Sequence, residues 1–362
     1  MSKGKVLLGM SGGVDSSVSA VLLQEQGYEV YGVTLKLFDG KDERTEACCG
    51  LSATADAKRV CDKLGIPHYT INFEKEFKEK VIDKFINEYQ NCRTPNPCID
   101  CNRYLKFGAM YELAKKLGIE YIATGHYAKV EYNEEYGKYV IKKSKAAKKD
   151  QTYVLYNIPS DLVEHVLFPL ADFESKDEIR KLAKEHGLLV AQKPESQEIC
   201  FITDNDYVNF LEKHNIQGMK HGKIVDKNGA VLGMHQGLHR YTIGQRRGLN
   251  IGGTKNRCFV VKKDLDKNIL YVAMGDENKY LYSTSCIIED FNFLTDDRPL
   301  KCTCKFRYRQ IDVPTNVEYK DNNMLKLTYV KSKAVTVGQI CVLYDGDICL
   351  GGGIIKSVEG NV

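Results

Sequence analysis

The chain has 362 residues, of which 43% are hydrophobic and 28% charged, a composition that indicates a globular protein of two or three domains. It excludes a helical membrane protein, because no apolar run approaches the roughly 20 residues of a membrane-spanning helix. The polar start leads directly into a strand-like segment. We therefore expect no signal peptide and a cytoplasmic protein whose 13 cysteines stay mostly reduced.

The net charge of +4 says little about partners, since 52 basic residues stand against 48 acidic ones. The distribution of charge is more informative. Residues 138–149 contain six lysines and no acid, and residues 235–263 contain seven lysines or arginines and no acid. Such a run is either a solvated basic face or a footprint for a polyanion, and two separate runs favour the polyanion.

The first part of the chain, residues 1–206, alternates strand-like with helical segments. We expect strands near residues 5–10, 28–35, 68–73 and 120–125, and helices near 16–27, 54–65 and 107–118. This order predicts an α/β domain with a parallel sheet covered on both faces.

The pattern changes after residue 206. Residues 207–282 contain short extended segments and many glycines, with a hairpin signal at Asp226-Lys227-Asn228-Gly229, and suggest a small central domain. Residues 283–362 are dominated by strands near 301–309, 316–320, 324–330 and 340–355. Regularly spaced strands separated by turns predict a C-terminal β-barrel.

The stretch VLLGMSGGVDSSV, residues 6–18, has the features of an anion-binding turn between a strand and a helix. Gly12 and Gly13 allow close backbone approach, and the helix that follows presents its positive N-terminus. The chain nowhere contains the Walker pattern Gly-x4-Gly-Lys-Ser/Thr. Asp15 cannot neutralise a phosphate, but its carboxylate could hold a Mg²⁺ ion that bridges phosphates.

Three cysteines lie in unusual contexts. Cys98 and Cys101 form a C-x-x-C after two prolines, and Cys200 lies near the end of the first domain. A structural zinc site would need two further ligands, and the sequence has no second C-x-x-C. Converging thiolates would instead suit sulfur transfer or a 4Fe–4S cluster. Cys48 and Cys49 are either ligands or loop residues, and the others are predicted to be core residues: Cys61, Cys92, Cys258, Cys286, Cys302, Cys304, Cys341 and Cys349.

The stretch SGGVDS resembles the PP-loop of the ATP pyrophosphatase superfamily. Seven further motifs follow in order: TPNPC-x-x-CN-x-x-x-KFG, YIATGHYA, KDQTYVLY, SQEICFI, HQGLHRYTIGQRRGL, FRYRQ and CLGGGII. Together they resemble bacterial tRNA-specific 2-thiouridylases over essentially the whole chain. The resemblance implies that ATP adenylates O2 of the wobble uridine in tRNAs for Lys, Glu and Gln, and that sulfur then displaces AMP.

The resemblance also implies roles for individual residues. ATP would bind at Gly9, Met10, Ser11, Gly12, Gly13, Val14, Asp15, Ser16, Leu35 and Gly125. The tRNA would meet Asn96, Pro97, Cys98, His126, Lys149, Asp150, Gln151, Arg307, Tyr308 and Gln339. Cys200 would receive persulfide sulfur from a sulfur-carrier protein or a cysteine desulfurase relay. Cys101 would act as the second thiol. The resemblance implies no membrane as a partner of the protein.

The sequence departs from the family at Cys98, where many members have aspartate. Cys98, Cys101 and Cys200 could together ligate a 4Fe–4S cluster, which is an alternative to the persulfide mechanism. Two other functions stay open. One is a PP-loop ligase that forms an amide on a small metabolite, and the other is an RNA-binding protein without catalysis.

Overall fold

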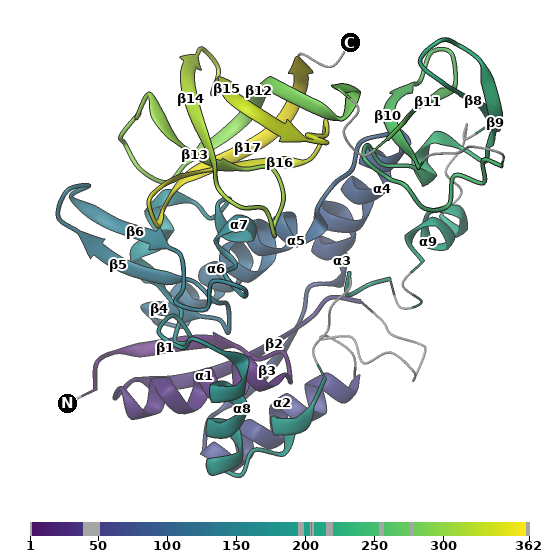
Figure 1. Ribbon diagram of the computed structural model, residues 1–362. Helices are drawn as coiled ribbons and strands as arrows, with labels where there is room; N and C mark the ends of the chain where they lie inside the picture. The colour runs from purple at the N-terminus through teal and green to yellow at the C-terminus, as the bar shows by residue number, and fades with distance from the viewer. Residues whose placement is uncertain are drawn as a thin grey trace.

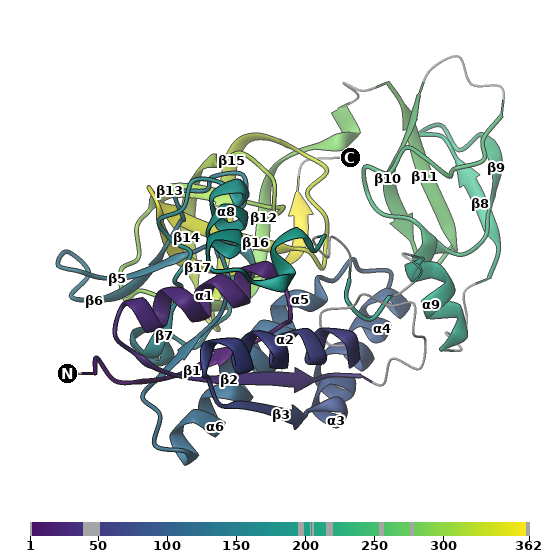
Figure 2. The ribbon, with the colours of Figure 1, turned by 90° about the horizontal axis from the view of Figure 1, so that it is seen from below.

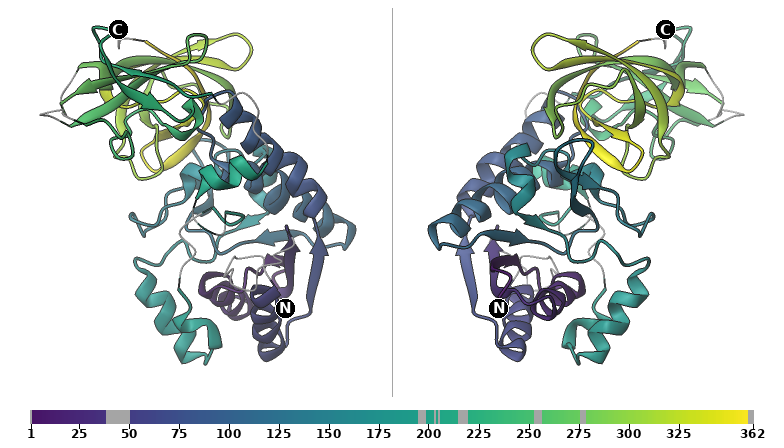
Figure 3. Two further views of the ribbon diagram at one scale, coloured as in Figure 1. Left: turned by 90° about the vertical axis from the view of Figure 1, so that its right-hand side faces the viewer. Right: turned by 90° about the vertical axis from the view of Figure 1, so that its left-hand side faces the viewer.

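The computed structural model describes residues 2–38, 51–194, 199–202, 204, 206–214, 220–252, 257–275 and 279–359. Three parts can be distinguished in Figure 1: a layered α/β part below, a barrel above it, and a small sheet to the right. Figure 3 shows the same division from two sides. Cys48 and Cys49 lie outside the described residues.

The α/β part is built on a parallel sheet in the order β3-β2-β1-β4-β7. Its strands are β1 (Lys5–Gly9), β2 (Glu29–Lys36), β3 (His68–Asn72), β4 (Tyr121–Ala123) and β7 (Val166–Leu167). Side chains of β1 alternate between two buried clusters, with Leu7 in one and Val6 and Leu8 in the other. Both faces of the sheet are therefore covered, as the sequence predicted.

Helices α1 (Val14–Glu25), α2 (Leu51–Leu64) and α8 (Lys176–Glu185) cover one face of the sheet. Figure 2 shows α1 and α2 side by side over the sheet. The remaining helical segments of this part are α3 (Glu74–Phe77), η1 (Lys78–Ile82), α4 (Asp83–Gln90), α5 (Pro97–Asp100), η2 (Cys101–Ala109), α6 (Met110–Lys116), α7 (Thr152–Leu155), η3 (Ser160–His165) and η4 (Leu189–Gln192). The predicted helices near 16–27, 54–65 and 107–118 are confirmed, although helix begins earlier than predicted before α6.

The central part contains a four-stranded sheet in the order β10-β11-β8-β9. Its elements are α9 (Tyr207–Lys213), β8 (Gly222–Val225), β9 (Val231–His235), η5 (Leu238–Arg240), β10 (Cys258–Asp264), β11 (Ile269–Met274) and η6 (Lys279–Leu281). The predicted hairpin at residues 226–229 is confirmed, because β8 and β9 pair antiparallel across it.

The C-terminal part is an antiparallel barrel in the order β12-β15-β14-β13-β16-β17, closed by pairing of β17 with β12. Its strands are β12 (Tyr282–Phe293), β13 (Lys301–Lys305), β14 (Val313–Lys320), β15 (Met324–Lys333), β16 (Ile340–Asp345) and β17 (Ile348–Glu359). Cys286, Cys304 and Cys341 are fully buried in its core, as expected for small hydrophobic residues.

A hairpin of β5 (Lys129–Asn133) and β6 (Lys138–Lys142) extends the barrel sheet, because β6 pairs with β17. In the sequence, residues 138–149 stand out only as a basic run, and this hairpin was not predicted. Among the described residues, no helix is long and apolar enough to span a membrane.

Candidate active site

The Gly-rich loop lies where β1 ends, between β2 and β4 on either side. The strand order reverses at this point, and parallel sheets bind ligands at such positions. Helix α1 begins directly after the loop, and its N-cap, Gly13, has no side chain that could accept from the first turn. The amide groups of that turn therefore face the loop as an anion-binding end.

Serine hydroxyls hold the loop in shape. Ser16 Oγ lies 3.2 Å from the amide nitrogen of Ser11 and donates to the Gly13 carbonyl, also at 3.2 Å. Ser17 Oγ donates to the same carbonyl at 2.8 Å. These bonds close the loop onto the start of α1 without using a ligand.

Gly12 adopts a backbone conformation that requires glycine. Its φ is +68°, and a Cβ placed there would lie 2.2 Å from the carbonyl oxygen of Ala53 in α2. Both the backbone strain and the steric clash with rigid backbone exclude a side chain at this position.

We expect Gly12→Ala to weaken ATP binding at least tenfold and to cost about 1–3 kcal/mol of stability, because the loop must move away from α2. Isothermal titration with ATP and urea unfolding measure the two effects. Gly27→Ala is the matched control, since Gly27 has φ of +90° but nothing within 4 Å of its added Cβ. Equal losses of ATP affinity in both variants would contradict the steric argument.

Asp15 lies in the first turn of α1, where two side chains from distant segments reach it. The Tyr127 hydroxyl donates to Oδ1 at 2.8 Å, and Lys176 of α8 forms an ion pair with Oδ2. Neither Tyr127 nor Lys176 was predicted to contact Asp15. Tyr127 could have been identified from the sequence, because it belongs to the YIATGHYA motif. Lys176 could not, because no pattern in the sequence around it indicates contact with the distant Gly-rich loop.

The other residues predicted for ATP binding surround the loop. Met10 and Leu35 are both buried, but in the clusters on opposite faces of the sheet, and Thr34 Oγ1 donates to the Met10 carbonyl at 2.8 Å. Gly125 packs against the start of α1, where an added Cβ would lie 2.9 Å from the amide nitrogen of Ser16. The structure thus gathers Gly9–Ser16 and Gly125 at one edge of the sheet.

His126 follows Gly125 and is buried rather than exposed. Its Nδ1 lies 2.7 Å from Thr124 Oγ1, and its ring contacts Phe107 and Phe168. Burial, with a smaller effect of Lys106, lowers the pKa of His126 well below its usual value of 6.5. The imidazole is therefore neutral in the folded protein at neutral pH.

This burial predicts a pH dependence of stability. Below about pH 6.5 the His126 side chain takes up a proton in the unfolded chain but not in the native protein. As the pH is lowered further, the free energy of unfolding should therefore fall by up to about 1.4 kcal/mol for each pH unit. Urea unfolding at a series of pH values should show a shallower fall for His126→Phe, which keeps the ring packing. The exposed His221, as His221→Phe, is the control. An unchanged slope in His126→Phe would contradict the assignment.

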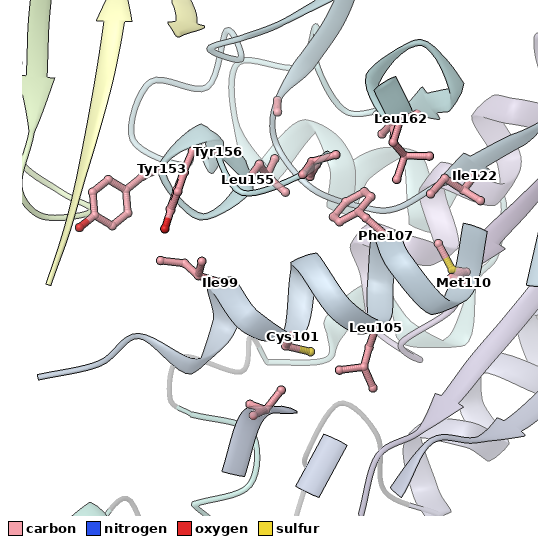
Figure 4. Close-up of a cluster of buried hydrophobic side chains, with 14 of the residues drawn as sticks. Ile99, Cys101, Leu105, Phe107, Met110, Ile122, Tyr153, Leu155, Tyr156 and Leu162 are labelled. Carbon is pink, nitrogen blue, oxygen red and sulfur yellow. The ribbon is translucent and has the colours of Figure 1, made fainter. Parts of the chain in front are cut away.

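The C-x-x-C lies on a helix that begins at Pro97. Asn96 caps this helix, its Oδ1 accepting from the amide of Cys98 at 3.2 Å, and Pro97 occupies the first position. Cys98 is exposed, whereas Cys101 is buried at the start of the π-helical segment η2. In Figure 4, Cys101 and Leu105 project from one side of the helix and Ile99 projects towards Tyr156.

The π-helical segment has a structural cause in the sequence. The amide of Met110 donates to the carbonyl of Leu105, five residues earlier. An added Cβ at Gly108 would lie 2.7 Å from the carbonyl of Arg103, so glycine permits the wider turn. Such segments are frequent at functional sites, and this one begins at Cys101.

Cys200 is half-buried and packs against the same apolar cluster that contains Cys101. Its neighbour Phe201 anchors it there, with ring contacts to Phe77 and Phe85 at centroid distances of 5.7 and 5.4 Å. Sequence positions far apart therefore meet in one core. The described residues contain no group of three His, Cys, Asp or Glu side chains arranged to hold a metal ion, so the structure gives no support for the cluster alternative.

We call the continuous helix α5–η2, which carries Cys98 and Cys101, the thiol helix. Its opposite face lines a cavity of about 420 Å³ that lies between this helix and the barrel. Asn96, Asp100 and Arg103 line it from the helix, and Asn292 lines it from the barrel. Asp100 forms an ion pair with Lys84 at 2.8 Å. Burial raises the pKa of Asp100, and Lys84 opposes that shift.

The segment 149–151, predicted to contact tRNA, lies where the α/β part meets the barrel. The Tyr308 hydroxyl donates to the Lys149 carbonyl at 3.4 Å, so the structure brings these two residues together. Gln151 forms two hydrogen bonds with the backbone of Tyr127. Its backbone N–H donates to the Tyr127 carbonyl, and its side-chain Oε1 accepts from the Tyr127 backbone N–H.

Asp150 points inwards. Its carboxylate accepts from the Ser144 amide and from Thr152 Oγ1, which in turn lies 3.1 Å from the Tyr344 hydroxyl in the barrel. Burial raises the pKa of Asp150. These contacts orient the segment, in which Lys149 and Gln151 are half-buried on either side of the buried Asp150.

Arg307 and Gln339 lie on barrel loops near this junction. The Arg307 guanidinium donates to the Ala334 carbonyl, and burial lowers its pKa. The side-chain Oε1 of Gln339 is buried and has no hydrogen-bond partner among the described atoms. A buried acceptor without a donor is costly, so Gln339 has an unused polar group at this junction.

Three family models match consecutive parts of the chain. They are a tRNA methyl transferase HUP domain over residues 4–204, a tRNA methyl transferase PRC-barrel domain over 208–274, and an aminomethyltransferase beta-barrel domain over 283–355. The first alone spans more than half of the chain.

Relatives match over the full length. The tRNA-specific 2-thiouridylase MnmA of Clostridioides difficile is 48% identical over 358 residues, which cover 97% of this chain and 98% of the relative. The protein of the same name from Acetivibrio thermocellus is 46% identical over 364 residues, 98% of this chain and all of the relative. The chain belongs to the tRNA-specific 2-thiouridylase family. The predicted family is therefore confirmed, and the PP-loop fold of this family uses ATP.

A solved 4-thiouridine synthetase–RNA complex with bound ATP shares 20% identity with this thiouridylase family member, with a TM-score of 0.37 over 58% of this chain and 50% of that chain.

Proposed function

We propose that this protein is an ATP-dependent enzyme that replaces O2 of a tRNA uridine with sulfur. The observation that carries the proposal is its 48% identity to a tRNA-specific 2-thiouridylase over 97% of the chain. The specific substrate is proposed to be the wobble uridine of tRNAs for Lys, Glu and Gln.

The ATP site is proposed to be Gly9–Ser16 with Leu35 and Gly125. Asp15 is the residue that would hold Mg²⁺. A single carboxylate beside a phosphate-binding loop suits this ion, which takes one or two carboxylates together with substrate phosphates. Bound there, Mg²⁺ would neutralise charge on the phosphates. The loop amides and the N-terminus of α1 orient the α-phosphate towards the uridine oxygen. O2 forms a bond to the α-phosphorus while the bond from that phosphorus to the bridging oxygen of the β-phosphate breaks, so that pyrophosphate leaves and the uridine is adenylated.

The sulfur step is assigned to two thiols. A persulfide on Cys200 attacks C2 of the adenylated uridine, and AMP departs with the former O2. The Cys101 thiolate then attacks the Cys200 sulfur, which breaks the S–S bond and leaves the outer sulfur on the base. The product is 2-thiouridine and a Cys101–Cys200 disulfide, which an external thiol reductant must reduce before the next cycle.

The tRNA is proposed to contact Asn96, Pro97, Cys98, His126, Lys149, Asp150, Gln151, Arg307, Tyr308 and Gln339. We propose domain limits of 1–206, 207–282 and 283–362, with the target base extruded from the anticodon loop into the active site. A sulfur-carrier protein or a cysteine desulfurase relay would supply the persulfide. The cytoplasm is the proposed location, and no step is assigned to an iron–sulfur cluster.

The test is incubation of the protein with ATP, unmodified tRNA and a sulfide or persulfide source, followed by mass spectrometry of the product nucleosides. We expect 2-thiouridine, together with pyrophosphate release that requires tRNA. Pyrophosphate release that requires a small metabolite instead would indicate an amide-forming ligase. No turnover with any substrate would indicate a binding protein.

A further inference from the structure

The Gly-rich loop contains no lysine, yet a lysine from a remote segment reaches its backbone. Lys193 follows η4, and its Nζ donates to the carbonyl oxygen of Gly12 at 3.3 Å. The same ammonium forms an ion pair with Asp56 Oδ2 in α2 at 2.8 Å. About three-quarters of each side chain is buried, since the exposed fractions are 23% and 25%.

The contact with the Gly12 carbonyl determines where the next amide points. The Gly12 carbonyl and the Gly13 N–H belong to one planar trans peptide, so they point in opposite directions. An ammonium that holds the carbonyl on the side of α2 therefore directs the Gly13 N–H away from α2. Ala53 restricts Gly12 from the same side, because an added Cβ would lie 2.2 Å from its carbonyl oxygen.

We propose that Lys193 is a positioning residue for ATP. It fixes the Gly12–Gly13 peptide so that the Gly13 amide faces the phosphates before the nucleotide binds, and Asp56 holds Lys193 in place. Donors that are already oriented bind an anion more tightly than donors that must reorganise. This inference takes from the proposed function only the identity of the ligand, ATP.

The experiment compares ATP and adenosine binding by isothermal titration in the absence of tRNA. Because adenosine has no phosphates, a positioning role predicts that Lys193→Met raises the dissociation constant for ATP about tenfold and leaves that for adenosine unchanged. Lys193→Arg should recover most of the ATP affinity, since a guanidinium can donate to both acceptors. Asp56→Asn should weaken ATP binding in the same direction by a smaller factor.

Lys181→Met is the matched control, because Lys181 lies on α8 with its side chain 78% exposed. Equal losses of ATP and adenosine affinity in Lys193→Met would overturn the inference in favour of a purely structural anchor. If Lys193→Met bound ATP as tightly as the control variant Lys181→Met, the inference would also be overturned. Thiolation by the unmodified protein tests the proposed function separately, so the two failures can be told apart.

Discussion

Replacing Cys200 with serine is expected to lower tRNA thiolation by at least about a thousandfold, because a hydroxyl cannot carry a persulfide. Binding of ATP and tRNA should stay within about twofold, since the half-buried side chain changes little in volume. Mass spectrometry of digested tRNA measures 2-thiouridine, and filter binding measures tRNA affinity.

Cys302→Ser is the matched control. Cys302 is also half-buried, but it lies on β13 of the barrel, where burial raises the pKa of its thiol to about 12. At neutral pH it therefore has almost no thiolate, and its replacement should leave thiolation intact. Full activity of Cys200→Ser would refute the persulfide role. A large loss of tRNA affinity in that variant would instead make Cys200 a structural residue.

The sheet and the loop could be predicted because their signals are local. Buried runs such as Val6–Leu8 identify strands, and the helix that follows the loop can be recognised from the glycine that ends it, Gly27, which has a φ of +90°. The order of strands and helices then implies that residues following β1 and β4 meet at one edge. Asp15 and Gly125 do meet there.

The partners of the loop could not be predicted, because they come from remote segments. Lys176 and Lys193 belong to the last elements of the α/β part, and neither has a local pattern that distinguishes it from a surface lysine. The hairpin β5–β6 was missed for a different reason. Its lysines interrupt the apolar alternation of the two strands, which pair with each other along their length, while among the described residues β6 pairs with β17 only at Lys142 and Ile348.

The thiol helix is held by all three parts of the protein. Cys92, which precedes it, packs into the core of the central part. Thr94 Oγ1 lies 3.5 Å from Thr242 Oγ1 of that part, and Arg93 packs against Gly338 of the barrel, where an added Cβ would lie 2.5 Å from Arg93 Cβ. The segment that leads to Cys98 and Cys101 is thus in direct contact with both the central part and the barrel.

Asp15→Asn should reduce tRNA-dependent pyrophosphate release at least about a hundredfold, because the variant loses the carboxylate proposed to hold Mg²⁺ beside the phosphates. The asparagine can still accept from Tyr127, so the loop should keep its shape. The ion pair with Lys176 is lost, and its partly exposed position limits the cost in stability to about 1 kcal/mol or less. A coupled pyrophosphate assay with tRNA titration measures the rate, and urea unfolding measures the stability.

Asp177→Asn provides the control for charge, because Asp177 is exposed in the first turn of α8 and lies next to Lys176 in the chain. It removes one negative charge from the same neighbourhood without touching the loop, and pyrophosphate release should stay within about twofold. Adenylated uridine that still forms at the normal rate in Asp15→Asn would reject the metal-holding role. Equal losses in both variants would assign the effect to overall charge, since only Asp15 lies against the anion-binding end of α1.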